Sequence, residues 1–335
     1  MKQLFKFTSL ATIIILITTL LIIILIKNFQ DTPFNPKERE SISFRIKHGE
    51  SLSRIAHLLV QRKIISSEFK FKLIVKLSHK DKSIKAGEYE LSPSMTPDAI
   101  LNILTLGKVK LYRVTFPEGT TIKEMSEILE QNKICSKKNF IKKAYDKSLL
   151  KKSKLKATSF EGYLFPDTYM FQKNESPEKI IMTMYNKFQC VYSKKFDIRA
   201  KRTGFSKHKI ITLASIIEKE TGCANERPII SSVFHNRLKK GMRLETDASV
   251  IYGIKNFDGN IKKKDLEEFT PYNTYKIKGL PPGPIANPGI DSIKAALYPS
   301  KTNFLFFVSK KNGTHYFSRT LKEHNRAVRK YQLRR

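Results

Sequence analysis

The hydrophobic and polar positions change their period several times along the chain, and each change predicts an element. Residues 8–26 form one uncharged run, about the 20 residues that a helix needs to cross a bilayer. Residues 207–222 repeat apolar side chains at helical spacing. Residues 304–308 and 315–318 are two apolar runs joined by a turn at Lys311-Asn-Gly, which predicts a β-hairpin. Helices mixed with short strands predict an α+β fold behind an N-terminal transmembrane helix.

The run at 8–26 is longer than the core of a signal peptide, and no small-x-small cleavage site follows it. We therefore expect an uncleaved signal anchor. Lysines both precede and follow the run, so charge sets its orientation only weakly. A short head at 1–7 and a long tail favour a tail outside the cytoplasm, with 27–41 as a linker.

An internal repeat follows the linker. Residues 46–66 recur as residues 116–136, with glycines, apolar positions and a Lys-Ile pair in register. Each copy predicts a short strand, a glycine turn and an amphipathic helix, with Ser51 and Thr121 as N-caps. Two copies are too few for a solenoid and predict small α+β modules of the LysM kind, which bind amino-sugar polymers. A spacer that lifts the rest of the chain off the membrane is the alternative.

A glutamate lies on an apolar stripe near the end of the predicted helix at 207–222. Glu218 follows Ile211 by seven residues and Ala214 by four, so it continues their stripe, whereas Lys219 and Glu220 fall toward the outer face. Burial and the carbonyl end of the helix should raise the pKa of this carboxyl. A carboxyl that stays protonated near neutral pH can serve as a general acid.

Two alternatives to that assignment stay open. Glu218 can instead pair with Lys219, Arg227 or Arg237 and only stabilise the fold. Glu220 is the rival acid, because it is chemically identical and two residues away. The stripe argument prefers Glu218.

Aromatic residues and carboxylates meet again in residues 160–169, which include Glu161 and Asp167. Rings pack on pyranose faces and carboxylates accept hydroxyl hydrogens, so this pattern fits a sugar site, although an ordinary core loop has the same pattern. Residues 279–289 are dense in proline and glycine and predict a rigid loop suited to ligand contact.

Composition adds a strong positive charge. The 335 residues contain 63 Lys+Arg against 30 Asp+Glu, a formal net charge of +33, and 40% are hydrophobic. Such a chain suits a polyanionic neighbour such as nucleic acid, an anionic membrane surface or an acidic wall polymer. A lysine- and isoleucine-rich coding bias explains the charge equally well, and no nucleic-acid-binding signature accompanies it. Nucleic acid is therefore the least favoured partner.

The three cysteines are far apart and form no C-x-x-C pair, which excludes a disulfide framework and a cysteine metal site. Cys223 lies near Glu218 in sequence, but no histidine adjoins it. We interpret it as a small buried residue and not as a nucleophile.

Taken together, the motifs after the anchor resemble the endolytic murein transglycosylases of the YceG-like family. The resemblance rests on several long motifs in order: Glu161-Gly-Tyr-Leu-Phe-Pro-Asp-Thr-Tyr, Ala214-Ser-Ile-Ile-Glu-Lys-Glu-Thr, Val233-Phe-His-Asn-Arg-Leu, Gly241-Met-Arg-Leu-Glu-Thr-Asp, Tyr272-Asn-Thr-Tyr, Gly279-Leu-Pro-Pro-Gly-Pro-Ile-Ala-Asn-Pro-Gly, and Phe317-Ser with Glu323-His-Asn-Arg. It departs at Glu245, where a glutamine is usual, and at Ala248, where a proline is usual.

The resemblance implies a bacterial inner-membrane protein with one transmembrane segment and its C-terminal domains outside the cytoplasm. The expected regions are a cytoplasmic tail (1–7), an anchor (8–26), a linker (27–41), a LysM-like module (42–110), a second LysM-like repeat with a basic connector (111–157) and a catalytic domain (158–335). The implied reaction is lytic cleavage of the MurNAc-GlcNAc β-1,4 bond inside nascent peptidoglycan strands, which leaves 1,6-anhydroMurNAc ends and terminates elongation.

The resemblance places the catalytic acid on Glu218 and implies no metal or cofactor. Penicillin-binding protein synthases are the implied partners beside the glycan strand, and no nucleic acid is expected. The expected sugar contacts are Asn236, Asp247, Tyr252, Tyr272, Asn273, Thr274, Glu161 and Asp167. A glycan-binding scaffold for the synthases, without catalysis, is the alternative function.

Overall fold

The computed structural model describes residues 2–255 and 257–333, with side chains from residue 12 onward. The chain folds into two compact units that divide between Tyr112 and Arg113. Both units mix helices with two-stranded sheets, which confirms the α+β prediction.

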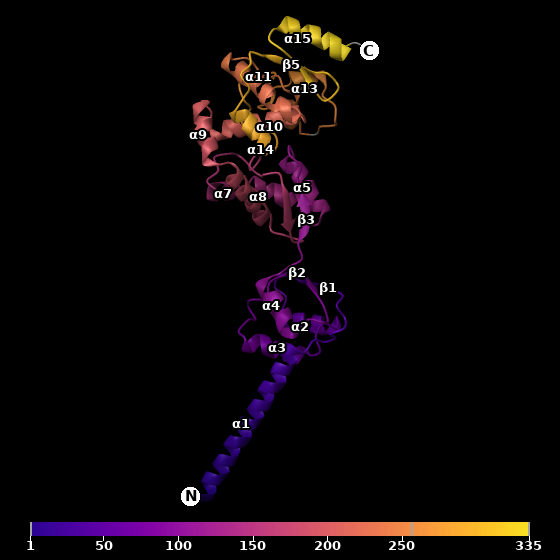
Figure 1. Cartoon of the computed structure of the whole chain (residues 1–335), viewed down its shortest axis with the longest axis vertical. Helices are drawn as coiled ribbons and strands as arrows, with labels where there is room; N and C mark the ends of the chain where they lie inside the picture. Colours follow the sequence, from indigo (N-terminus) through magenta and orange to yellow (C-terminus); the bar gives the residue numbers. More distant parts are fainter. Residues whose placement is uncertain (1, 256, 334–335) are drawn as a thin grey trace. The chain divides into compact units, whose positions relative to one another are not determined.

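The first unit is a small sheet and three short helices at the end of a long one (Figure 1). Its elements are α1 (Lys2–Asp31), β1 (Ile42–Ile46), α2 (Leu52–Gln61), α3 (Glu68–Leu77), β2 (Gly87–Leu91) and α4 (Pro97–Leu106). β1 and β2 pair antiparallel with Phe44 opposite Tyr89. Both rings are buried with Leu59 and Phe71, so alternate strand positions and one face of each helix form the core.

Helix α1 contains the predicted membrane segment. Among the described residues, Thr12–Asp31 is the one stretch of helix long and apolar enough to cross a membrane. Its apolar side chains from Ile13 to Leu25 are at least half exposed. The predicted helix is therefore confirmed, and its exposed apolar surface is consistent with a single-pass anchor.

The internal repeat is a structural repeat as well. In the second copy, β3 (Tyr112–Thr115) ends directly before residue 116 and α5 (Ile122–Gln131) lies within the copy, just as β1 ends at the start of the first copy and α2 lies within it. The Ser51 hydroxyl accepts the N–H of Arg54, and the Thr121 hydroxyl accepts the N–H of Glu124, as the N-cap prediction requires. The shared spacing thus produces the same strand, turn and capped helix twice. That these modules bind glycan stays a prediction.

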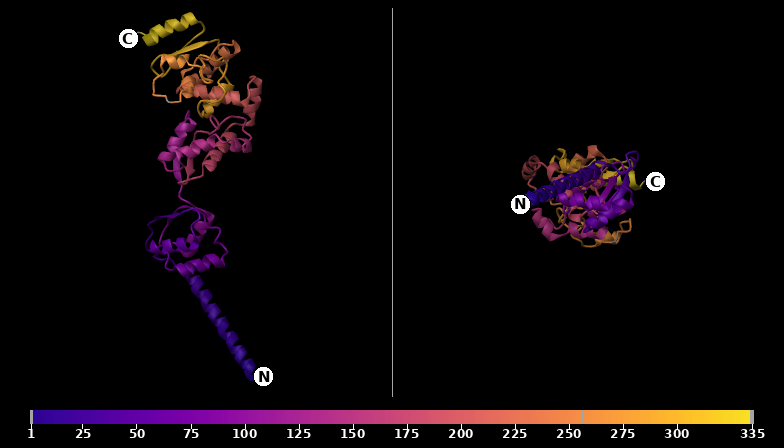
Figure 2. Two further views of the ribbon diagram at one scale, coloured as in Figure 1. Left: turned by 180° about the vertical axis from the view of Figure 1, so that it is seen from behind. Right: turned by 90° about the horizontal axis from the view of Figure 1, so that it is seen from below.

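The second unit contains the second copy and the rest of the chain (Figures 1 and 2). Its further elements are α6 (Lys137–Ala144), α7 (Lys147–Lys152), β4 (Thr168–Phe171), α8 (Pro177–Val191), α9 (Lys194–Arg202), α10 (Lys207–Glu220), η1 (Ala224–Glu226), α11 (Arg227–Lys239), α12 (Asp247–Gly253), α13 (Lys263–Glu267), α14 (Ile290–Leu297), β5 (Phe306–Ser309), β6 (His315–Ser318), α15 (Leu321–Val328) and η2 (Arg329–Leu333). β3 pairs with β4, and β5 pairs antiparallel with β6 as the predicted hairpin.

Helix α10 is the centre of the second unit. It packs against α9, α11, α12 and α14, and every residue from Ile210 to Ile217 is buried. The sequence predicted two buried stripes and an outer face. The outer face is missing over this stretch because neighbouring helices surround α10, and small side chains such as Ala214 and Ser215 let them approach.

Glu161 and Gly162, both buried, connect the N-terminus of α5 to the proline-rich loop. The Glu161 carboxylate accepts hydrogen bonds from the Ile122 N–H at 3.1 Å, the Asn287 amide at 2.9 Å and the Tyr252 hydroxyl at 3.2 Å. Burial raises the pKa of Glu161 to about 8, although these donors oppose the shift. Gly162, with φ of +82°, lies against the ring of Pro284. This pair fixes three segments that are far apart in sequence.

Replacing Gly162 with alanine should strongly destabilise the second unit, because the new Cβ would overlap Pro284 in a backbone conformation that L-residues avoid. We expect a loss of about 3 kcal/mol, combining overpacking and backbone strain. Gly204→Ala is the matched control, since Gly204 has φ of +77° but open space around it. It should cost only about 1 kcal/mol. Circular dichroism during urea unfolding measures both, and equal losses would contradict the packing argument.

Glu161 should also make stability depend on pH. A carboxyl whose pKa rises from 4.5 to about 8 on folding binds its proton more tightly in the folded state. Folding stability from this group is therefore full below pH 4.5 and is lost as pH rises toward 8, with a slope of at most about 1.4 kcal/mol per pH unit. Glu161→Gln should flatten this part of the profile, because an amide stays neutral and the Tyr252 hydroxyl can accept from it. If urea titrations show that the free energy of unfolding changes equally with pH in wild type and variant, Glu161 is not neutral in the folded state.

Candidate active site

Two carboxylates near the end of α10 face different surroundings. Successive helical residues are rotated by about 100°, so Glu218 and Glu220 point about 200° apart. Lys219 between them is exposed. The two chemically identical groups therefore meet different neighbours.

Glu218 is enclosed by polar partners. Its side chain is 5% exposed. The Arg227 guanidinium donates to Oε1 at 3.2 Å, and the N–H of Gly289, the N-cap of α14, donates to Oε2 at 2.8 Å. The predicted burial is confirmed, but the expected apolar setting is wrong, because both carboxylate oxygens bind donors. The pairing with Arg227 matches the alternative in which Glu218 stabilises the fold.

A second carboxylate, absent from the sequence-based prediction, adjoins this ion pair. Glu118 Oε2 lies 3.9 Å from the Arg227 guanidinium, and its carboxylate lies so close to Gly289 that any Cβ there would overlap it. Burial and the nearby Glu218 raise the pKa of Glu118, while Arg227 lowers it. One arginine thus holds two acids together with the loop before α14.

Glu220 is less well satisfied. Its Oε1 is shielded from solvent and has no hydrogen-bond partner among the described residues. Burial raises the pKa of Glu220 to about 7, and the neighbouring Asp247 adds to the rise, while the Thr246 hydroxyl opposes it. A carboxyl with this pKa is about half protonated at neutral pH, which is the state that proton transfer uses. The prediction that Glu220 faces outward is wrong.

Glu220 lines a cavity of about 460 Å³. The walls come from the end of α10, the loop before α12, the β5–β6 hairpin, α15 and η2. Polar residues around it include Glu220, Arg237, Glu245, Asp247, Tyr275, His315 and His324. Phe307 and Val308 add apolar surface. A cavity with apolar walls and several carboxylates and hydroxyls suits a sugar.

His324 is a second unsatisfied group in the same cavity. Its Nδ1 is buried without a partner among the described residues, and its ring stacks on Phe306 at 5.2 Å between centroids. Burial and the nearby Arg237 lower the pKa of His324, which favours the neutral ring. Glu220 and His324 can therefore both exchange hydrogen bonds with an uncharged ligand.

The other polar groups of the cavity are already held in place. The Tyr275 hydroxyl donates to Asp247 Oδ1 at 2.8 Å, and His315 Nδ1 lies 2.7 Å from Glu226 Oε2. Glu245 Oε2 lies 3.0 Å from the guanidinium of Arg237. These pairs set the shape of the wall on which a ligand would rest.

Of the predicted sugar contacts, Asp247 lines the cavity, and three others support its walls. Asn273 is fully buried and donates to carbonyls of the α13 segment, and Thr274 accepts the N–H of Thr246 at 2.9 Å. The Asn236 amide donates to the Thr302 and Phe304 carbonyls at 2.8 and 2.9 Å. For Asn273 and Thr274, both fully buried, the predicted direct contact is corrected to loop support. Asn236 is half-buried, and its contact with sugar stays a prediction.

The remaining predicted contacts lie away from this cavity. Tyr252 and Tyr272 pack ring to ring at 4.9 Å, and Tyr252 binds Glu161. Glu161 is 3% exposed, so its predicted contact with sugar is corrected to an interior role. Asp167 pairs with Lys187 at 2.9 Å, which lowers the pKa of Asp167. Asp167 is still partly exposed, so its contact with sugar stays a prediction.

Tyr275, His315 and His324 were not predicted. Tyr275 stands in the quoted Tyr272-Asn-Thr-Tyr motif, and its position three residues after Tyr272 was an available signal. The two histidines are about 100 residues from Glu220 and reach it only through the hairpin and α15. No local pattern could have indicated them.

The structure also accounts for both departures from the family pattern. Glu245 has φ of +55° and pairs with Arg237, whose guanidinium also binds the Arg243 and Leu244 carbonyls. Ala248 stands in the first turn of α12, where a proline is also tolerated because the N–H there has no helical partner.

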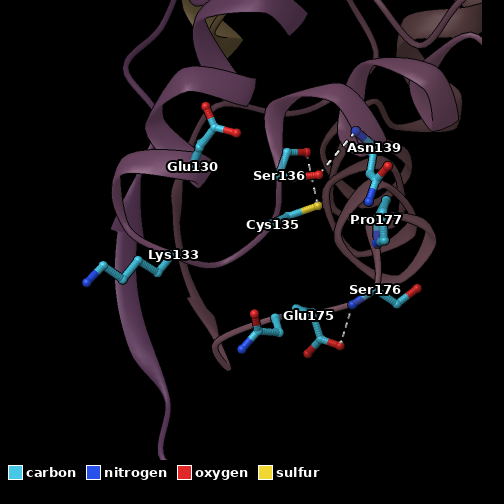
Figure 3. Close-up of a pocket in the computed structure, with 9 residues that line it drawn as sticks. Glu130, Lys133, Cys135, Ser136, Asn139, Glu175, Ser176 and Pro177 are labelled. Carbon is cyan, nitrogen blue, oxygen red and sulfur yellow. Dashed lines mark hydrogen bonds between the residues drawn. The ribbon is translucent and has the colours of Figure 1, made fainter. Parts of the chain in front are cut away.

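Another cavity, of about 450 Å³, lies between the segment from the end of α5 to the start of α6 and the loop before α8 (Figure 3). Its Cys135 thiol is buried, which raises the pKa of that thiol, and its Glu175 pairs with Lys179 at 2.7 Å. It contains none of the predicted site residues. The cavity beside Glu220 is thus the better candidate for an active site.

Comparison with known proteins gives one consistent family. The model of the YceG-like family matches residues 44–330. The "Endolytic murein transglycosylase" of Bacillus subtilis is 37% identical over 315 residues, covering 89% of this chain and 87% of that protein. The protein of the same name from Streptococcus pneumoniae serotype 2 is 25% identical over 88% of this chain, which spans only 59% of that relative.

A solved structure agrees with this. The crystal structure of a yceG-like protein from Listeria monocytogenes is 37% identical, with a TM-score of 0.60 over 86% of this chain and 99% of that one. Since the family model covers nearly the whole chain, and a relative more than 30% identical covers most of it, the chain belongs to the YceG-like family.

Proposed function

We propose that the chain is an endolytic peptidoglycan lytic transglycosylase that cuts nascent glycan strands and leaves 1,6-anhydroMurNAc ends. Family membership and the names of its relatives support the activity. The observation that carries the mechanism is the unsatisfied Glu220 carboxyl, with a pKa near 7, in a cavity that can hold a sugar.

The reaction needs one group that first gives and then takes a proton. Protonated Glu220 would donate to the oxygen that bridges MurNAc C1 and GlcNAc C4, and the C1–O bond would break. The acetamido group of the same MurNAc can steady the oxocarbenium-like state. The Glu220 carboxylate would then take the proton of the C6 hydroxyl as its oxygen bonds to C1. Protons balance, and no water is consumed.

Most glycosidases divide such work between two carboxylates. Here the proposed reaction returns the proton to its donor, so one group with a pKa near the working pH is enough. Asp247 and Tyr275 would face the sugar beside Glu220, and His324 would offer a neutral ring nitrogen to a hydroxyl or an amide.

The sequence assigned the acid to Glu218, and that assignment remains the competing proposal. Its ion pair with Arg227 and its bond from the Gly289 N–H favour a supporting role. A binding scaffold without catalysis is the second competing function. Helix α1 as a single-pass membrane anchor, and penicillin-binding protein synthases as partners, are further proposals that rest on the apolar helix and on the resemblance.

Replacing each glutamate separately by glutamine distinguishes the two acids. Glu220→Gln should lower the release of anhydro-ended muropeptides from sacculi by about 10²- to 10⁴-fold, because an amide cannot donate as a general acid. Glu218→Gln should keep most of the activity and instead lose about 1–3 kcal/mol of stability through its weakened contact with buried Arg227. Mass spectrometry of the muropeptides measures the first effect, and urea unfolding the second. An inactive but stable Glu218→Gln with active Glu220→Gln would restore the original assignment, and no anhydro ends from wild type would favour the scaffold.

Activity should fall at alkaline pH. The pKa of Glu220 is raised to about 7, so its protonated fraction and kcat/KM should decrease about tenfold per unit well above pH 7. Asp247→Asn should move this alkaline limb to lower pH, because removing a nearby negative charge makes the carboxyl easier to ionise. A pH–rate profile on soluble glycan strands tests this, and an unmoved limb in the variant would place the titrating group elsewhere.

A further inference from the structure

The apolar run of α1 passes directly into the core of the first unit. Residues 7–26 carry no charge and, at 1.5 Å per residue, cover the ~30 Å hydrocarbon core of a bilayer. Ile26, at the end of this run, already packs against the core cluster, and Phe29 belongs to it at 6% exposure. The folded unit therefore begins at the level where α1 leaves the bilayer.

Helix α3 lies at this junction. It packs against α1, and the Lys70 ammonium lies 5.6 Å from the centroid of the Phe29 ring. Figure 1 shows α3 on the side of the first unit from which α1 leaves. Since both helices belong to the same compact unit, the position of α1 sets that of α3.

The outer surface of α3 is both apolar and basic. Phe69 is 70% exposed and Leu77 is 60% exposed, and they are eight residues apart on one side of the helix. Lys70 and Lys76 are exposed beside them, and the half-buried Lys72 adds a third positive charge. Exposed apolar side chains occur elsewhere on the chain, but here two of them lie beside lysines on a helix that packs against α1.

A hollow of about 360 Å³ adjoins this surface. Its lining combines the apolar residues Leu52, Phe69 and Leu73 with Lys72 and Lys76 and two serines. Apolar surface next to positive charge is complementary to a phospholipid, because the lipid has an apolar acyl chain next to an anionic phosphate.

We propose that α3 is a membrane-surface helix, which rests Phe69 and Leu77 in the leaflet from which α1 emerges and binds anionic phospholipid headgroups through its lysines. An amphipathic helix buries its apolar face about 5–10 Å into the boundary between headgroups and acyl chains. Lysines near the surface of an anionic membrane add attraction. The first unit is then fixed by two contacts with the bilayer, α1 and α3, and cannot swing freely about α1.

Tryptophan reporters test this directly, because the chain contains no tryptophan. The full-length protein with Phe69→Trp is placed in nanodiscs of phosphatidylglycerol brominated near the headgroup, which quenches tryptophan close to the lipid. Leu111→Trp is the matched control in the same unit. The backbone N–H of the adjacent Lys110 donates to the Glu88 carbonyl of β2, and Figure 1 shows β2 away from α1. We expect quenching of Phe69→Trp at least about twofold stronger than that of Leu111→Trp.

Two further variants separate the possible failures. The inference rests on α1 crossing the membrane, as proposed above, and Leu20→Trp should be quenched by lipid brominated deep in the acyl chain if it does. Quenched Leu20→Trp with unquenched Phe69→Trp would overturn the role of α3 while leaving the anchor intact. Adding Lys72→Gln and Lys76→Gln to Phe69→Trp should reduce its quenching in phosphatidylglycerol to the level seen in phosphatidylcholine. Unchanged quenching would rule out the proposed contact between these lysines and the headgroups.

Discussion

The second unit depends on one helix, α10, whose middle from Ile210 to Ile217 is buried on all sides. Because four other helices pack against α10, a polar side chain that turns toward them must find a partner within the protein or face a cavity. Glu218 and Glu220 illustrate the two outcomes. The rotation of about 100° per residue turns the first toward Arg227 and Gly289, and the second toward a cavity. The same chemistry thus becomes an ion pair at one position and a proton donor candidate at the other.

Many residues of the long sequence motifs stabilise loops. The segments before α12, around α13 and before α14 have little regular structure, so their backbone groups need side-chain partners. Asn273, Thr274 and Arg237 supply those hydrogen bonds from buried positions, and Asn287, in the loop before α14, joins that loop to the Thr120 carbonyl. Residues that looked like sugar contacts by type are therefore mostly the framework that keeps the cavity walls in place.

Local patterns predicted the parts of the fold that depend on local interactions. The apolar anchor helix, the capped helices of the repeat and the β5–β6 hairpin follow from spacing, caps and a turn, and the structure has all of them. The direction of Glu220 could not be predicted in this way, because it depends on which elements pack around the end of α10. His324 could not be predicted either, since α15 brings it to the cavity from about 100 residues away.

The large positive charge of the chain does not oppose the chemistry proposed for Glu220. Exposed lysines act through water and salt, which screen charges beyond about 8–10 Å, whereas Asp247 acts on Glu220 at short range in a shielded site. Burial and this one carboxylate therefore raise the pKa of Glu220 in a chain of charge +33. Most of the net positive charge comes from exposed lysines, such as those of α3 beside α1. The proton chemistry is governed by the few groups that line the cavity.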